Sequence, residues 1–119
     1  MQPDITAKTY EEMRTKKRFD VNLKAFGNVV GHEGKKGQCI ISNLSASGAR
    51  LHCEKTLDVK TGMSLALIIF IPNTILTITN TAEIMWLTRK RDVVSVGVKF
   101  QDILSEIMMN SLTRATVAV

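Results

Sequence analysis

Aromatic side chains are scarce in this sequence. One Trp, one Tyr and four Phe make up 5% of its 119 residues. Val, Ile, Leu and Met must therefore fill the core. The shortage also argues against a barrel that binds single-stranded nucleic acid, because such barrels stack bases on aromatic platforms. We expect neither DNA nor RNA as a partner.

Long apolar runs and cysteines are scarce too. The longest apolar run, residues 65–71, is far shorter than the roughly 20 residues that span a bilayer. Residues 1–18 are polar and charged and do not resemble a signal peptide. We therefore expect no membrane insertion and a cytoplasmic location. Cys39 and Cys53 lie in apolar strand-like runs, where buried free thiols are favoured over a disulfide.

The rest of the composition is that of one ordinary globular domain, with 45% hydrophobic and 23% charged residues. The net charge of +5 mildly favours an anionic partner. We recognise no Ser–His–Asp, Cys–His or paired-carboxylate set, and His52 has no further metal ligands at suitable spacing. The sequence therefore predicts neither an enzyme nor a metal site.

Alternating apolar and polar residues begin at Phe19 and predict a succession of short strands. The intervening turns are short, which implies antiparallel neighbours. A set of six strands this small should close, because open edges invite aggregation. We therefore predict an all-β fold, a six-stranded antiparallel β-barrel with a C-terminal α-helix. The predicted strands cover residues 19–30, 38–43, 49–53, 64–71, 75–87 and 93–100, and the connection 54–62 has room for one helical turn.

Three expectations concern burial. The run 64–71 is nearly all apolar, which predicts a strand buried on both faces. Trp86 shares its phase with inward residues of the 75–87 strand, which favours a core position over a stacking platform. From residue 103 the period becomes helical, with Asp102 or Ser105 near the helix start. The predicted apolar stripe of that helix consists of Ile103, Ile107, Met108 and Leu112, with Ala115 as its extension.

Two short strings stand out from this pattern. Arg-Thr-Lys-Lys-Arg at 14–18 places four cations within five residues, and Asn-Leu-Ser-Ala-Ser-Gly at 43–48 supplies an amide, two hydroxyls and a glycine before a strand. Taken singly, the first is typical of a solvated charge run and the second of a plain turn. Together they suggest a site for a ligand that contains both phosphate and purine.

The order of these features resembles the PilZ domain family over about residues 14–112. Arg14 and Arg18 match its RxxxR motif, and Asn43, Ser45 and Gly48 match its (D/N)xSxxG motif. Residues 82–86 resemble the fifth strand of the family, and Val-Gly-Val-Lys-Phe at 96–100 resembles its GVxF strand.

The resemblance implies a bacterial receptor for cyclic di-GMP with a six-stranded barrel and a helix. Such receptors regulate motility, exopolysaccharide synthesis, biofilm formation and virulence, have no catalytic activity and need no cofactor besides this ligand. Here the output would pass through an unidentified downstream protein. The implied organisation is a flexible segment at 1–13, a PilZ-like domain at 14–114 and a tail at 115–119.

The resemblance also implies roles for single residues. Arg14 and Arg18 would contact phosphate and guanine, in either order, while Asn43 would accept from guanine less well than the Asp of many relatives. Ser45 would bond a phosphate or base, and Gly48 would permit close backbone approach or a positive φ. Additional contacts are expected from Lys17, Ser47 and Trp86, with Lys16 adding attraction.

The ligand is expected to bind with micromolar affinity and to order the 14–18 arm. Met13 stands where relatives with an intercalated ligand dimer often carry arginine, which favours one nucleotide per chain. The alternative is a PilZ-like adaptor that acts through protein contacts and does not bind the nucleotide. The two arginines count against that alternative.

Overall fold

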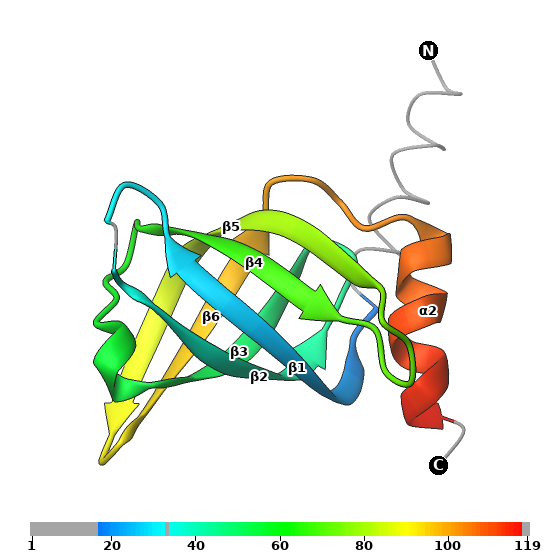
Figure 1. Cartoon of the computed structure of the whole chain (residues 1–119), viewed down its shortest axis with the longest axis horizontal. Helices are drawn as coiled ribbons and strands as arrows, with labels where there is room; N and C mark the ends of the chain where they lie inside the picture. Colours follow the sequence, from blue (N-terminus) through cyan, green and yellow to red (C-terminus); the bar gives the residue numbers. More distant parts are fainter. Residues whose placement is uncertain (1–16, 33, 118–119) are drawn as a thin grey trace.

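The computed structural model describes residues 17–32 and 34–117, with side chains as far as residue 114. Along this part of the chain six strands are followed by one α-helix (Figure 1). The elements are β1 (Phe19–Val29), β2 (Lys36–Leu44), β3 (Gly48–Glu54), the short 3-10 helix η1 (Lys55–Leu57), β4 (Ser64–Phe70), β5 (Thr77–Lys90), β6 (Val93–Phe100) and α2 (Glu106–Val117).

The strands form one closed barrel in the order β1-β2-β3-β6-β5-β4, and every neighbouring pair is antiparallel. Pairing of β1 with β4 closes the circle, so each strand has hydrogen-bonded neighbours on both sides. Helix α2 lies at one end of the barrel (Figure 1). The predicted all-β, six-stranded antiparallel barrel with a C-terminal helix is confirmed, and η1 is the expected helical turn.

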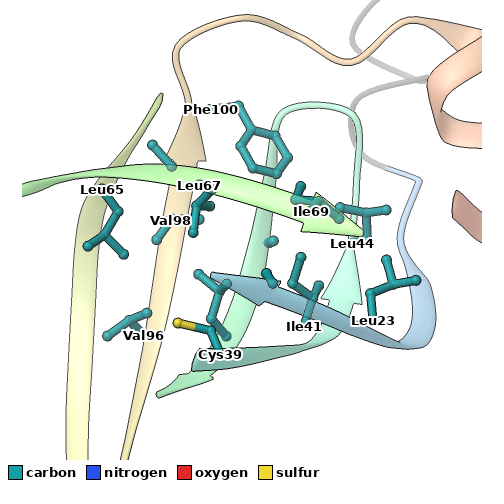
Figure 2. Close-up of a cluster of buried hydrophobic side chains, with 14 of the residues drawn as sticks. Leu23, Cys39, Ile41, Leu44, Leu65, Leu67, Ile69, Val96, Val98 and Phe100 are labelled. Atoms are coloured by element: carbon teal, nitrogen blue, oxygen red, sulfur yellow. The ribbon is translucent and has the colours of Figure 1, made fainter. Parts of the chain in front are cut away.

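The barrel interior is aliphatic. Alternate residues of each strand point inward, and Figure 2 shows side chains from several strands meeting there. The fully buried side chains include Leu23, Ile41, Leu65, Leu67 and Ile69. Each contributes about 1.5–3 kcal/mol on burial. Cys39 and Cys53 are buried free thiols, as expected.

Strand β4 corrects the first burial expectation. Its residues alternate between buried and exposed, and Ile68 and Phe70 are 37% and 45% exposed. A barrel has one interior, and within the described residues no second layer covers the outer face of β4. The apolar run was therefore wrongly interpreted as a strand buried on both faces.

Strand β5 corrects the second expectation. It begins at Thr77, so Ile75 and Leu76 belong to the preceding turn and are exposed. The pairing with β6 shifts by one residue between Ile84 and Trp86, which is the signature of a β-bulge. The bulge brings Trp86 to the outer face, where it is 42% exposed. The predicted core position of Trp86 was wrong.

Helix α2 corrects the third expectation. The helix starts at Glu106, where the Ser105 hydroxyl caps it by accepting from the Met108 N–H at 3.2 Å. The segment before Ser105 is not helical, so a helical stripe counted from Ile103 does not give the buried face of α2. Ile103, Ile107 and Met108 are exposed, and the buried face consists of Met109, Leu112 and Thr113. Only Leu112 of the predicted stripe is buried; the Ala115 side chain lies outside the described residues.

Candidate functional site

The turn between β2 and β3 is held by its own residues. The Ser45 N–H donates to the Gly48 carbonyl at 2.8 Å, and the Gly48 N–H donates to the Ser45 hydroxyl at 3.2 Å. The Ser45 hydroxyl also lies 3.3 Å from the Gly48 carbonyl. Ser45 is 1% exposed, so its side chain fixes the shape of the turn from within.

Two further bonds attach this turn to the C-terminal part of the chain. The Phe100 N–H donates to the Ser47 carbonyl at 2.8 Å, and the Leu104 N–H donates to the Ala46 carbonyl at 2.8 Å. A side chain at Gly48 would overlap the Val98 carbonyl oxygen, so β3 and β6 approach closely there. The sequence predicted that glycine at 48 serves either a close backbone approach or a positive φ. The close approach is observed, and β6 is the strand that approaches. The turn is therefore preformed.

Arg18 and Asn43 meet at the edge of this turn. The Arg18 Nη1 donates to Asn43 Oδ1 at 3.1 Å, although 25 positions separate the two residues. Asn43 Nδ2 donates in turn to Asp20 Oδ1 at 3.4 Å. Arg18 directly precedes β1 and Asn43 lies near the end of β2, so pairing of these strands brings the two motifs together.

A second wall is formed by β3, β5 and β6. The Trp86 indole covers Gly97, where any side chain would overlap it. The Arg50 guanidinium lies 5.9 Å from the Trp86 ring centroid, a cation–π distance. The bulge in β5 and the glycine in β6 therefore give the indole an outward position beside a cation.

The two walls enclose a pocket of about 570 Å³. Of the residues that the structure describes, three cations line it, namely Arg18, Arg50 and Lys99, and no carboxylate does. The other lining residues are Asn43, Ser45, Ser47, Gly48, Ala49, Met85, Trp86, Gly97 and Val98. An anion with a flat apolar part fits such a lining, because cations attract its charge and the indole offers a stacking face.

The structure brings most of the predicted site residues together. Arg18, Asn43, Ser45, Ser47, Gly48 and Trp86 all line this pocket. Lys17 does not; its Nζ lies 5.3 Å from the centroid of the Phe19 ring. Arg14 and Lys16 lie outside the described residues.

The sequence interpretation missed six lining residues, namely Ala49, Arg50, Met85, Gly97, Val98 and Lys99. The register of β3 with β6 places Arg50 opposite Gly97 and Gly48 opposite Lys99. Pairing the NxSxxG strand with the GVxF strand would have pointed to all of them except Met85. Met85 lies on the outward face already given by the alternation of the 75–87 strand, and the bulge beside it brings Trp86 to the same face.

Comparison with known proteins bears on these motifs. The family model of the PilZ domain matches residues 12–117. This chain belongs to the PilZ domain family. No curated protein matches the sequence.

Solved structures share the fold of this PilZ domain. The PilZ domain of YcgR from Escherichia coli, determined with c-di-GMP, gives a TM-score of 0.62 at 12% identity, covering 86% of this chain and 87% of that one. The inhibitor of motility MotI/DgrA from Bacillus subtilis gives 0.61 at 18% identity, covering 85% and 48%. The Borreliella burgdorferi PlzA protein in complex with c-di-GMP gives 0.56 at 21%, covering 91% and 43%. This chain thus spans about half the length of MotI/DgrA and less than half that of PlzA.

Proposed function

We propose that this PilZ domain is a receptor for cyclic di-GMP and that the nucleotide binds in the pocket between the β2–β3 turn and Trp86. The contact between Arg18 and Asn43 carries the proposal, because it joins the two motifs at the edge of a cationic pocket. The ligand present in the YcgR and PlzA structures supports the choice of nucleotide.

Guanine recognition falls to Arg18 and Asn43. The Arg18 fork matches the adjacent O6 and N7 acceptors of guanine, a pairing worth about 1–3 kcal/mol in DNA. Asn43 offers one carbonyl oxygen to the N1–H of the base. In the structure Arg18 donates to that same oxygen, so guanine binding replaces this contact or shares it.

The second wall takes the remaining parts of the ligand. Arg50 and Lys99 neutralise phosphodiester charge, and Trp86 stacks on a base from its exposed face. The Ser45 hydroxyl supports the turn by accepting from the Gly48 N–H, and its second lone pair accepts from a donor of the ligand. Ser47 lines the pocket beside it. The pocket volume of about 570 Å³ and Met13 both favour one nucleotide per chain.

In this proposal nucleotide binding orders the arm at 14–18 and so completes the site; residues 14–16 lie outside the described residues, and Arg18 already contacts Asn43. Arg14 is assigned a phosphate or guanine contact by its match to RxxxR, and Lys16 and Lys17 add attraction. Because ordering an arm opposes binding by about 1–2 kcal/mol per residue, we expect micromolar affinity, near −8 kcal/mol.

The domain acts as an adaptor for an unidentified downstream protein. In this proposal the output passes through contacts of the domain with that partner. The likeness to MotI/DgrA, an inhibitor of motility, favours motility control, with biofilm or exopolysaccharide synthesis as the other outputs. The alternative remains a PilZ adaptor that does not bind nucleotide; Arg18 and the cationic lining argue against it.

Isothermal titration calorimetry with cyclic di-GMP tests the proposal. We expect one nucleotide per chain and a micromolar dissociation constant for the wild type. Arg18→Ala weakens binding about 10- to 100-fold or abolishes it, because 1.4 kcal/mol corresponds to a factor of ten. Arg14→Ala has the same effect. Arg114→Ala is the matched control, since this exposed arginine on α2 does not line the pocket.

No heat and no thermal shift at high micromolar nucleotide would refute the receptor function and leave the adaptor alternative. If the wild type binds and both arginine variants bind equally well, the receptor function stands and the site assignment is wrong.

A further inference from the structure

Cys39 and Cys53 occupy directly opposite positions on β2 and β3. Both side chains point into the barrel and are 2% exposed, and Figure 2 shows the Cys39 sulfur among the aliphatic side chains. The two Sγ atoms lie only 3.0 Å apart, with both thiols free. Neither thiol lines the nucleotide pocket described above.

The spacing of the sulfurs is close to that of a disulfide. A disulfide bond is about 2.05 Å long, so the two Sγ atoms, 3.0 Å apart, must approach by roughly 1 Å. Directly opposite residues of antiparallel strands have Cβ atoms about 4.5–5.5 Å apart, whereas a disulfide spans about 3.5–4.5 Å. Rotation of the two side chains, together with an approach of β2 and β3 by about 1 Å at this pair, therefore brings the sulfurs together.

The contact between the thiols makes them unequal. The two sulfurs share a hydrogen bond that either thiol can donate, and donation from Cys39 lowers the pKa of Cys53 below its ordinary value. The same bond, together with burial, raises the pKa of Cys39. Cys53 is therefore the sulfur that forms a thiolate first, and the thiolate is the nucleophile of disulfide exchange.

We propose that Cys39 and Cys53 are a modification site, a thiol pair that exchanges with a small disulfide such as oxidised glutathione and closes into a cross-strand disulfide. The Cys53 thiolate attacks one sulfur of the small disulfide and releases one thiol. Cys39 then loses its proton and attacks the Cys53 sulfur, which releases the second thiol. Two protein thiols are oxidised to one disulfide, and one small disulfide is reduced to two thiols that carry the two protons.

Access to the pair comes from the open end of the β2–β3 hairpin. Cys39 is the fourth residue of β2 and Cys53 the second-last of β3, on the side away from the Asn43–Gly48 turn. Strand ends open more readily than strand centres, so exchange occurs there without unfolding of the barrel. The disulfide would close a loop that contains the whole ligand-binding turn.

The test equilibrates the reduced full-length protein in glutathione buffers of graded ratio at pH 8. Samples are quenched with acid, free thiols are alkylated, and intact masses are measured. The same series is run on protein unfolded in urea. We expect both alkylation sites to disappear together, and the native equilibrium constant for disulfide formation to exceed the unfolded one about tenfold or more, because β2 and β3 hold the sulfurs together.

Two alkylated thiols at every ratio, mixed disulfides alone, disulfide-linked dimers, or an equal constant in native and unfolded protein would each overturn the proposal. Thermal melts of oxidised and reduced wild type give a second readout, with an upward shift of the oxidised midpoint expected. The matched control is Cys39→Ala/Cys53→Ala, whose midpoint must be the same in both buffers. Neither readout depends on nucleotide binding.

Discussion

Two glycines shape the proposed nucleotide pocket through different contacts. At Gly48 a methyl group would overlap the backbone oxygen of Val98, which the β3–β6 pairing holds in place. At Gly97 a methyl group would overlap the Trp86 indole, a side chain that can rotate away. The same substitution should therefore be costly at one position and correctable at the other.

We expect Gly48→Ala to lower the free energy of unfolding by about 1–3 kcal/mol, the usual range for overpacking. Gly97→Ala should displace the indole and weaken nucleotide binding. In a Trp86→Ala background Gly97→Ala should cost little further affinity, because the displaced ring is absent. Urea unfolding and calorimetric titration measure these effects; additive losses of affinity at Gly97 and Trp86 would contradict the contact.

The (D/N)xSxxG motif allows Asp or Asn at its first position, and this chain has Asn43 there. The neighbouring Asp20 explains why an Asp at position 43 would be unfavourable. The Asn43 amide donates to Asp20, so Asn43→Asp would place two carboxylates 3–4 Å apart, an arrangement that is unfavourable at neutral pH. We expect the exchange Asn43→Asp/Asp20→Asn to bind cyclic di-GMP more tightly than the wild type, by about tenfold, and more tightly than Asn43→Asp alone. Calorimetry checks the order of affinities, and a double variant no better than the wild type would count against guanine recognition by Asn43.

At the scale of elements, period-two alternation predicted the six strands and the short turns predicted antiparallel neighbours, but the strand order, in which β3 pairs with β6, was not predicted. The error at β4 arose because a barrel has only one interior, and the other two errors arose where an irregular segment changes the phase. The bulge at Met85 reverses the facing of Trp86, and the non-helical stretch before Ser105 shifts the face of α2. Neither irregularity has a sequence signature, because each depends on pairing with a distant segment.

The corrected face of α2 is open to measurement. We expect Leu112→Ala to lower the free energy of unfolding by about 2–5 kcal/mol, as for other buried leucines. Ile107→Ala, at a position 79% exposed, should change it by less than about 0.5 kcal/mol. Urea denaturation of both variants decides between the two faces, since the face predicted from sequence requires a large effect at Ile107.

At the scale of the molecule, the closed barrel explains why the site could be predicted only in part. The motifs identified Arg18 and Asn43 by order along the chain, and β1–β2 pairing brings them together. Arg50 lies outside the motifs and Lys99 occupies the variable position of GVxF, and both enter the pocket because β3 pairs with β6. A site built across strands needs the strand order, which spacing along the sequence does not contain.

Binding should stabilise the whole barrel, because the pocket joins residues of β2, β3, β5 and β6. Nucleotide at 100 times its dissociation constant adds about 2.7 kcal/mol to the free energy of unfolding. For a domain of this size we expect the melting midpoint to rise by about 10 °C. Differential scanning fluorimetry measures the shift with the Arg18→Ala variant alongside, which should show little or none at the same nucleotide concentration.

The outward turn of Trp86 has an optical consequence. It is the only tryptophan of the chain and it lines the pocket, so its emission reports on this site and on no other part of the protein. Its fluorescence is also free of signals from a second indole. Stacking of a guanine should quench this single emission, which makes the unlabelled protein an optical sensor of the occupancy of its own pocket.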